Sequence, residues 1–525
     1  MTFSAPEIAW APALPMIVVL LAGALGVLVE AFVRTPATRR TVQLVLTTAA
    51  IVLAFALTVV QWVGLTGAGT EVMATMISVD RQALLWHSLI LILAALSLML
   101  FADRTRSGET PFAPLASAVP GSPEEQTARH RGFELTEVYP LGLLAVGGMM
   151  LFVTVTDLIF LFVALELLSL PLYILVASAR RRRLLSQEAA LKYFLLGAFA
   201  SAVMLFGTAL LYGATQSTGF AQIAAQASLL TDRAGMAVVG IVFVLSGLLF
   251  KLGAVPFHSW TPDVYEGAPT PVTAFMGALV KAAAAAALLR VAYTAFYPFV
   301  QEFDWIIWTV AIASMLLGSV VALRQSDIKR MLAYSSVGHA GFILVAFAGL
   351  PERALSAVPF YVLAYGLATV GAFAVVTQVR ERHEDGALGA EATRLGQWAG
   401  LGKRHPLLAA SMALFMLSFA GIPLTAGFVG KFVAFAAAVS AGAWVLVLVA
   451  GIAAAISAFF YVRLIVLMFF TDAPEDVEEA VAVTPTALSR VVIYGTAILT
   501  VLLGVVPSPV LRLAESAASL VVHPF

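Results

Sequence analysis

The chain has 525 residues, of which 61% are hydrophobic and 11% charged, and its mean hydropathy is +0.97. Soluble domains carry about 25% charged residues, so this composition excludes a string of soluble domains and indicates a polytopic membrane protein. The net charge is zero, which argues against a nucleic-acid-binding surface. Cysteine is absent, which excludes thiolate zinc sites, cysteine-ligated iron–sulfur clusters and disulfides. We therefore expect no metal or redox cofactor in this chain itself.

Apolar stretches long enough to cross a bilayer recur along the whole chain, and a span needs about 20 such residues. We predict an all-α protein with about fourteen spans. They are placed at 13–33, 42–64, 82–102, 137–155, 158–178, 188–213, 236–256, 270–296, 304–323, 328–350, 356–379, 405–440, 442–469 and 488–507. The seventh is expected to break near Gly253 and Pro256, and the twelfth, too long for one crossing, near Gly421 and Pro423.

Basic residues set the predicted orientation, because loops that stay inside are enriched in lysine and arginine. If both termini lie on the outer face, twenty lysines and arginines fall on inner loops, four fall on outer segments and six lie within spans. The sequence thus predicts a multi-pass protein of the bacterial plasma membrane with both ends outside. Three polar segments, 103–135, 380–404 and 472–479, are expected to be solvated or partner-facing inner surfaces.

Three lysines fall well inside predicted spans, where a charge costs about 2.5–3.5 kcal/mol and usually serves a function. Lys251 precedes the break in the seventh span, where freed backbone carbonyls could accept its hydrogen bonds. Lys281 lies near the middle of the eighth span and is followed by six alanines, which allow close packing around a buried amine. Lys431 follows the break in the twelfth span. An interrupted span with a lysine therefore occurs twice, which points to inverted repeats with a site at mid-membrane.

Three further residues complete the predicted site. Glu166 is central in the fifth span, and a lone glutamate there is expected to be protonated or paired. Lys192, early in the next span, is its expected ion-pair partner. His339 is a candidate, although a single histidine in an apolar span can simply bond a neighbour. Arg290 and Arg463 lie nearer span ends and are expected to be structural.

This set of residues can take up and release protons without making or breaking other bonds. Burial favours the neutral form of an amine, and a nearby carboxylate favours its charged form. Moving an acidic partner can therefore switch the charge of a buried lysine. We find no phosphate-binding loop, no dinucleotide-binding glycine motif and no Ser–His–Asp arrangement.

Several motifs resemble the subunit N family of respiratory complex I, the NADH-quinone oxidoreductase. They are the tract FKLGAVPFHSWTPDVYEGAPTPVTAF at 250–275, YSS at 334–336, and GIPLTAGFVGK at 421–431. The WTPDVYEG portion resembles subunit N more than the related subunits L and M, and Lys431 stands where M-like relatives carry glutamate. The resemblance covers 137–507, and the 103–135 insertion departs from the minimal family pattern.

The resemblance implies fourteen spans with two inverted five-helix repeats and discontinuous helices 7 and 12. It divides the chain into 1–136 (three helices and the insertion), 137–300 (first repeat), 301–470 (second repeat) and 471–525 (acidic loop and last helix). It also assigns Glu166 to the family's helix-5 glutamate, and it assigns the family lysines of helices 6, 7, 8 and 12 to Lys192, Lys251, Lys281 and Lys431.

The implied function is proton translocation coupled to electron transfer from NADH to a quinone. NADH, FMN, iron–sulfur clusters and the quinone cavity are then expected on other subunits, with those membrane subunits and lipids as partners. A movable Glu166–Lys192 pair would tune Lys251, and protons would pass through Lys281 and His339 to Lys431.

Three other interpretations remain open from the sequence. A component of a multi-subunit cation/proton antiporter shares this fold, but Thr261, Val264 and Tyr265 argue against it. A haem protein or quinol oxidase is disfavoured because no two histidines share a span at ligand spacing. A purely structural scaffold is disfavoured by the buried lysines.

Overall fold

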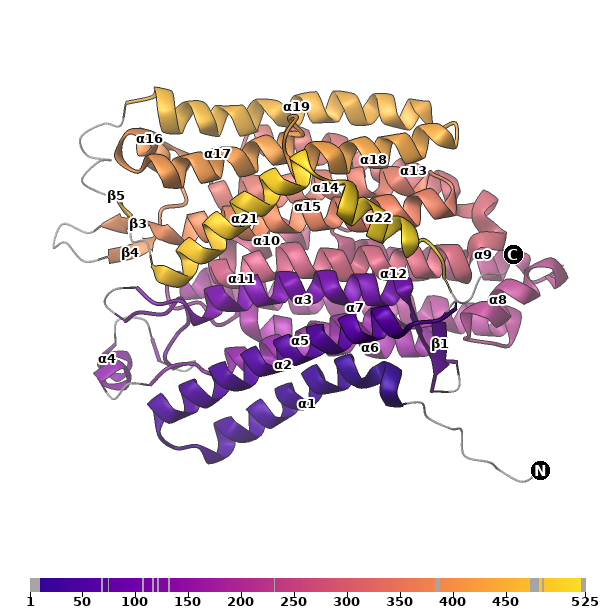
Figure 1. Ribbon diagram of the computed structural model, residues 1–525, viewed down its shortest axis with the longest axis horizontal. Helices are drawn as coiled ribbons and strands as arrows, with labels where there is room; N and C mark the ends of the chain where they lie inside the picture. Colours follow the sequence, from indigo (N-terminus) through magenta and orange to yellow (C-terminus); the bar gives the residue numbers. More distant parts are fainter. Residues whose placement is uncertain are drawn as a thin grey trace.

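Long apolar helices lie side by side along the longest axis of the molecule (Figure 1). The computed structural model describes residues 10–520 except 68, 74, 106–107, 116–117, 120–121, 131–132, 231, 383–387, 473–480 and 484–485. In the described part, twelve helices are long and apolar enough to cross a membrane, and α5, α17 and α18 are shorter apolar helices. With α17 and α18 taken as one interrupted crossing, the predicted all-α fold with fourteen spans is confirmed.

The helices that form these crossings follow in order. They are α1 (Trp10–Phe32), α2 (Pro36–Gly64), α3 (Arg81–Ala102), α5 (Val138–Phe152), α6 (Leu158–Val176), α7 (Arg183–Thr215), α9 (Ala234–Leu252) with α10 (Trp260–Gly267), α11 (Thr270–Phe275) with α12 (Lys281–Thr294), α13 (Val300–Leu323), α14 (Ile328–Phe347), α15 (Pro351–Gln378), α17 (Pro406–Ala420) with α18 (Ala426–Ser440), α19 (Trp444–Phe470) and α21 (Ala487–Val505). Short helices α4 (Pro123–His130), α8 (Phe220–Gln226), α16 (Leu401–Arg404) and α22 (Ser508–Ser516) lie between or after them.

Local sequence explains where many of these helices begin. Asp80, Asp157 and Asp327 each accept hydrogen bonds from backbone N–H groups in the first turn of α3, α6 and α14. Such caps satisfy donors that have no partner within the helix. Proline stands in the first turn of α2, α11, α15 and α17, where its missing N–H costs nothing.

Both predicted helix breaks are present. Helix α9 ends at Leu252, and Gly253 follows with φ +77°; helix α17 ends at Ala420, and Gly421 follows with φ +84°. This left-handed conformation suits glycine and terminates a helix. The next segments resume as α10 and as α18, whose N-cap Thr425 accepts from Phe428 N.

Small antiparallel sheets occupy connections that the sequence predicted as loops. Strand β1 (Gly69–Val72) pairs with β2 (Ile77–Asp80), with Gly69 opposite Asp80. Strands β3 (Val379–Arg382), β4 (Leu388–Glu391) and β5 (Val481–Val483) form a sheet in the order β4-β3-β5, with Arg380 opposite Glu391. The 380–404 segment is therefore partly ordered as sheet. Residues 473–480 of the acidic segment lie outside the described residues, and Asp472 is ion-paired with Lys403.

The 103–135 insertion is not merely a solvated surface, as the sequence had suggested. Glu109 binds Arg180 at 2.8 Å, and Arg183 donates to the carbonyls of Leu115 and Ala118. Phe112 is buried and contacts Phe101 edge-on. The insertion therefore packs onto one end of the bundle.

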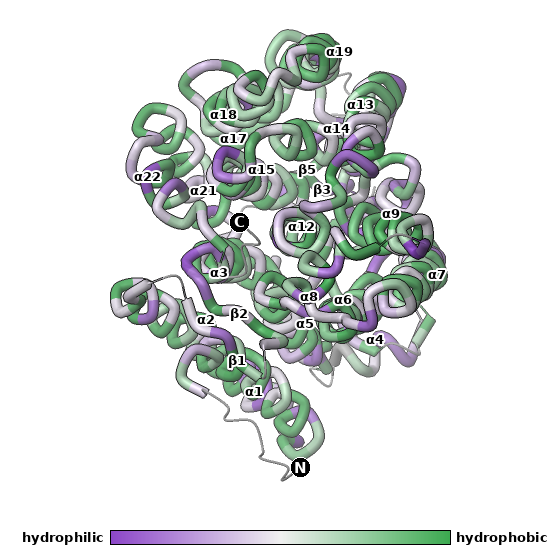
Figure 2. The backbone as a smooth tube through the Cα atoms, turned by 90° about the vertical axis from the view of Figure 1, so that its right-hand side faces the viewer, coloured by the Kyte–Doolittle hydropathy of each residue, from purple (hydrophilic) through white to green (hydrophobic). Residues whose placement is uncertain are grey.

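That end also holds α4, the sheet of β3, β4 and β5, and the loop with Arg180–Arg183; we call it the arginine-rich end (Figure 1, left). Helix α1 begins and α22 ends at the opposite end, near α8. Viewed along the helices, α12 lies at the centre of the bundle (Figure 2), and all 14 of its residues are buried. Lys281 is the first residue of this central helix.

Candidate functional site

Lys281 is held by two backbone carbonyls from different helices. Its Nζ donates to Leu252 O at 2.9 Å and to Ser336 O at 2.8 Å, and it lies 5.7 Å from the centre of the Tyr365 ring. Leu252 is the last residue of α9, so its carbonyl is freed by the helix break. The C-terminal end of a helix carries partial negative charge, which favours an ammonium there.

A π-helical turn, Met276–Val280, precedes Lys281 and joins α11 to α12. Such turns widen a helix locally and are frequent at functional sites. Gly277 lies in this turn, and a Cβ there would come within 3.0 Å of Thr369 Cγ2. The turn therefore places α12 directly against α15.

Lys251 has a different environment, made of aromatic side chains. It is buried in the last turn of α9, and its Nζ donates to Tyr193 Oη at 3.2 Å. The same nitrogen lies 4.9 Å from the Tyr193 ring centre and 5.6 Å from that of Tyr173. Trp260, the first residue of α10, stacks on the ring of Tyr193, with the ring centres 4.9 Å apart. The expectation that Lys251 binds carbonyls at the break was wrong, because Lys281 takes the Leu252 carbonyl.

The predicted Glu166–Lys192 ion pair is not formed. Lys192 binds Asp263 and Glu188, each at 2.7 Å. Glu166 has a buried Oε1 with no hydrogen-bond partner in the described part of the chain, and its carboxylate interacts through space with Lys251. Successive residues of a helix point about 100° apart. Tyr193, rather than Lys192, therefore faces the Lys251 side of α7.

Lys431 repeats the carbonyl arrangement in the second half of the chain. Its Nζ donates to Ala420 O at 3.0 Å, the last carbonyl of α17, and lies 4.5 Å from the Phe342 ring centre. A Cβ on Gly421 would come within 2.9 Å of Lys431 Cδ. Glycine at this position therefore serves both the turn and the lysine.

His339 lies between these lysines on α14. Its Nδ1 is 2.7 Å from Tyr361 Oη and its Nε2 is 3.2 Å from Tyr461 Oη. Its ring centre is 4.7 Å from that of Tyr365 and 5.8 Å from that of Phe342. Since Tyr365 also faces Lys281 and Phe342 also faces Lys431, His339 links the two lysines laterally.

These contacts join the predicted residues into one row across the middle of the bundle. We call it the lysine row; in order it comprises Glu166, Lys251, Lys281, His339 and Lys431. Lys192 lies outside the row, 43% exposed and joined through Asp263 to Arg330. The structure thus brings together five of the six predicted site residues.

Sequence reasoning missed the tyrosines that connect the row, Tyr193, Tyr361, Tyr365 and Tyr461, and the π-helical turn. It also did not single out Lys329, at the start of the predicted span 328–350. Lys329 is buried in the first turn of α14 and donates to Ala268 O at 2.8 Å. Tyr193 could have been suspected, because it directly follows Lys192, a predicted site residue. Nothing in the sequence around the other three tyrosines indicates that they belong to the site.

Arg290 has the structural role that its position near a span end suggested. It makes two 2.8 Å bonds to Asp80 and donates to Val153 O at 2.9 Å. Both charged side chains are almost fully buried. Arg463 is exposed and donates to Leu323 O. Among the described residues, no group of three His, Asp or Glu side chains could hold a metal ion.

Comparisons with known proteins agree along the whole chain. The model of the NADH:quinone oxidoreductase/Mrp antiporter transmembrane family matches residues 155–457. NADH-quinone oxidoreductase subunit N of Beutenbergia cavernae is 51% identical, over 99% of this chain and 100% of that protein.

Solved structures give the same picture. A chain of respiratory complex I from Thermus thermophilus with bound aureothin is 33% identical, with a TM-score of 0.75 over 95% of this chain and 99% of that one. A chain of the Mrp complex from Dietzia sp. has a TM-score of 0.76 over 97% of each chain at 23% identity, which shows a shared fold alone.

Proposed function

This chain belongs to the family of N subunits of NADH-quinone oxidoreductase, and from that premise we propose that it moves protons along the lysine row. It is a membrane-arm subunit of the oxidoreductase complex, and its enzymatic activity is that of the assembled complex. The observation that carries the proposal is that each residue of the row is linked to the next through one shared neighbour. Leu252, which follows Lys251, binds Lys281; Tyr365 lies against both Lys281 and His339; and Phe342 lies against both His339 and Lys431.

Lys251 is the switch in this proposal, because its ammonium is weakly held. One tyrosine hydroxyl and two ring faces surround it, and a cation–π contact is worth about 2 kcal/mol when desolvated. Glu166 has a carboxylate oxygen without a partner in the described residues. Movement of that carboxylate toward Lys251 stabilises the charged amine, and movement away releases its proton.

Lys281 and Lys431 receive and pass on the proton. Each donates to the last carbonyl of a half-helix, so a small shift of α9 or α17 changes how well an ammonium is stabilised. A proton leaving Lys251 is accepted by the neutral amine of Lys281, and His339 connects that residue with Lys431. Lys192 acts as a positioning residue, because its bond to Asp263 holds α10 against α7.

We further propose that residues 137–300 and 301–470 form two inverted repeats, preceded by 1–136 and followed by 471–525. Support comes from the chain order: the fourth crossing is broken both in the run from α5 to α12 and in the run from α13 to α19. The two runs are five crossings apart. Because five is an odd number, each helix of the second run crosses in the direction opposite to its counterpart in the first. The arginine-rich end then faces the cytoplasm, with both termini on the outer side of the plasma membrane.

In this proposal, NADH, FMN, iron–sulfur clusters and quinone bind other subunits of the complex. The absence of cysteine supports this for cysteine-ligated clusters. Other membrane subunits and lipids cover the bundle. Exposed apolar side chains such as Phe199, Phe432 and Phe459 are suited to such contacts.

A free-standing cation/proton antiporter component is not favoured. The family model covers both kinds of protein, and the fold is shared with an Mrp complex chain. The full-length relative at 51% identity is an oxidoreductase subunit, whereas the Mrp chain is 23% identical.

The test is Lys251→Met in the assembled complex, in inverted membrane vesicles. We expect NADH-driven proton pumping to fall by roughly tenfold or more, while the complex still assembles. Lys403→Met is the matched control, because Lys403 is 64% exposed and forms an ion pair with Asp472 at the arginine-rich end. Normal pumping by a fully assembled Lys251→Met complex contradicts the proposal.

A further inference from the structure

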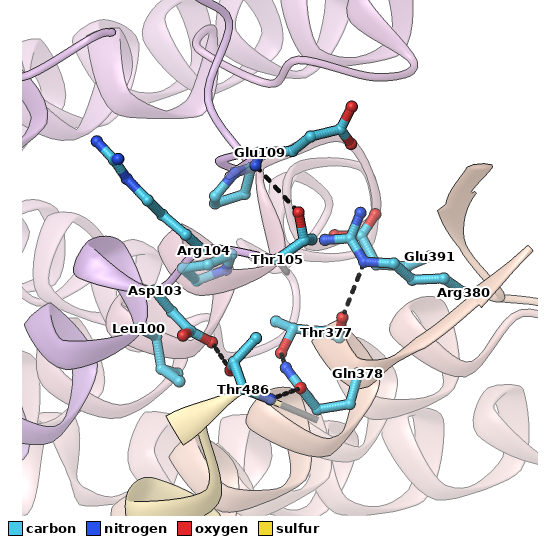
Figure 3. Close-up of a pocket in the computed structure, with 12 residues that line it drawn as sticks. Leu100, Asp103, Arg104, Thr105, Glu109, Thr377, Gln378, Arg380, Glu391 and Thr486 are labelled. Carbon is cyan, nitrogen blue, oxygen red and sulfur yellow. Dashed lines mark hydrogen bonds between the residues drawn. The ribbon is translucent and has the colours of Figure 1, made fainter. Parts of the chain in front are cut away.

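Two adjoining pockets open at the arginine-rich end, and neither belongs to the lysine row. Figure 3 shows the first, with Arg380 and Glu391 on one side and Asp103 near Thr486 on the other. The second, beside Lys329, is a small cavity of about 30 Å³. Pro111, Arg380 and Glu391 line both pockets. Glu391 therefore stands where they meet.

Glu391 is surrounded mainly by positive charge. The side chains of Arg380 and Lys329 act on its carboxylate, and Arg182 donates to its backbone carbonyl at 3.4 Å. Acidic groups are also present: Glu266 and Asp327 act on Lys329, and Asp103 and Glu109 line the first pocket together with Glu391. Burial acts to raise the pKa of Glu391, but Arg380 and Lys329 outweigh it and hold the pKa below its ordinary value. The carboxylate is therefore ionised at neutral pH.

Hydroxyl groups of α10, α11 and α14 occupy the region between Glu391 and Lys281 in three separate hydrogen-bonded pairs. Thr270 Oγ1 donates to Glu391 Oε1 at 3.2 Å, and Thr270 is the first residue of α11, which continues through the π-helical turn to Lys281. One turn further, Thr273 Oγ1 donates to Tyr265 O. Tyr265 Oη lies 3.4 Å from Ser336 Oγ, and the carbonyl of Ser336 binds Lys281.

A further buried hydroxyl belongs to Thr369 on α15. Thr369 interacts through this hydroxyl with Tyr365, whose ring faces Lys281. Its side chain faces Gly277 in the π-helical turn. The Thr369 hydroxyl therefore lies beside both the π-helical turn and the tyrosine that faces Lys281.

We infer that the junction of the two pockets is the entrance through which protons reach Lys281, with Glu391 as its positioning residue. The inference rests on the proposed function. One proton leaves the water at the arginine-rich end and is bound by the neutral amine of Lys281, while Glu391 remains ionised. Its negative charge offsets Lys329 and Arg380, which otherwise repel an incoming proton.

The experiment measures pumping by the whole complex in inverted vesicles, with pH varied on the side of the arginine-rich end. In Glu391→Gln we expect pumping to fall roughly three- to tenfold at alkaline pH and to stay near normal at mildly acidic pH. Protons are scarce at alkaline pH, so a repulsive entrance then becomes rate-limiting. Glu391→Asp restores pumping, because the charge returns.

Two further variants keep the test sharp. Glu381→Gln is the matched control on the adjacent strand β3; Glu381 binds Arg182 and Gln397, lines neither pocket, and its loss leaves the pH profile unchanged. Thr270→Val removes the first hydroxyl and is expected to shift the profile in the same direction, by less. This variant tests the entrance even if Glu391→Gln fails to assemble.

The outcomes separate this inference from the proposed function. If Lys281→Met stops pumping but Glu391→Gln and Thr270→Val pump normally at every pH, the entrance lies elsewhere. A loss in Glu391→Gln that is equal at all pH values, and not rescued by aspartate, means that Glu391 is only structural. Normal pumping by Lys281→Met overturns the lysine row itself.

Discussion

The two broken helices look alike in sequence but use their lysines differently. In the second half, Lys431 lies after the break and binds Ala420 O, the last carbonyl of its own broken helix. In the first half, Lys251 lies before the break and binds Tyr193, while the freed carbonyl of Leu252 is taken by Lys281 from the next helix.

The difference shows that the freed carbonyl is the repeated feature. The lysine that binds it comes from the broken helix itself in the second half and from the next crossing in the first half. It also leaves Lys251 with the weakest set of partners in the row. A lysine held by a hydroxyl and ring faces responds more readily to a nearby carboxylate than one held by helix carbonyls. The first half is therefore suited to switching, and the second to accepting a proton.

The largest effects are expected from removing the two carbonyl-bound lysines. Lys281→Met and Lys431→Met should each lower NADH-driven pumping by roughly tenfold or more. Both variants should also lower the yield of assembled complex, because each leaves one helix-end carbonyl, that of Leu252 or of Ala420, without its donor, at about 1–3 kcal/mol. Pumping and the yield of assembled complex measure the two effects. Normal pumping by either variant in a fully assembled complex would contradict the role of that lysine.

A smaller effect is expected at the glycines that end α9 and α17. Gly253→Ala and Gly421→Ala each place a side chain at positive φ, which costs about 1–2 kcal/mol. Only the Gly421 Cβ meets a row lysine, at 2.9 Å from Lys431 Cδ; at Gly253 it meets Thr261 Oγ1 at 3.0 Å. We expect similar losses in Tm but a several-fold larger loss of pumping in Gly421→Ala. Equal pumping by both variants would contradict the claim that only the break at Gly421 affects a lysine of the row.

Next in size is the pair of tyrosines around Lys251. Tyr193→Phe removes the hydroxyl that accepts from Lys251, at a cost of about 1 kcal/mol, and should slow pumping roughly fivefold. Tyr173→Phe is the matched control, since Tyr173 offers Lys251 its ring, with the ring centre 5.6 Å from Nζ, whereas Tyr193 also offers its hydroxyl. Both variants retain the ring faces. An equally slow Tyr173→Phe enzyme would show that the hydroxyl of Tyr193 is not what holds Lys251.

The smallest effect concerns the ion pair that the sequence misassigned. A double-mutant cycle on coupled turnover should give about 0.5–1 kcal/mol of coupling between Lys192→Gln and Asp263→Asn. Lys192→Gln and Glu166→Gln should be additive within about 0.5 kcal/mol, because these residues are not paired. Strong coupling between Glu166 and Lys192 would show that they pair during turnover.

Properties encoded locally were predictable. The spans follow from runs of apolar residues, the breaks follow from glycine and proline near positions 253 and 421, and the buried lysines are visible as charges within those runs. Each signal lies within about 20 residues of chain, so it requires no knowledge of neighbours. The family motifs add the expected order of the site residues.

Contacts between distant segments were not predictable. Arg290 and Asp80 are 210 positions apart, and His339 and Tyr461 are 122 apart. The Glu166–Lys192 pairing failed because the rotation of α6 and α7 about their axes depends on all their packing partners, and one residue changes the direction of a side chain by about 100°.

The sequence by itself determined that this chain crosses a membrane many times, where two crossings break, and which charges enter the bilayer, because hydropathy and backbone breaks are local. Only the tertiary structure decided what each lysine binds, that tyrosines and a π-helical turn connect the row, and that Glu391 faces the start of α11. Those relations depend on how helices pack against one another, and packing is a property of the whole bundle.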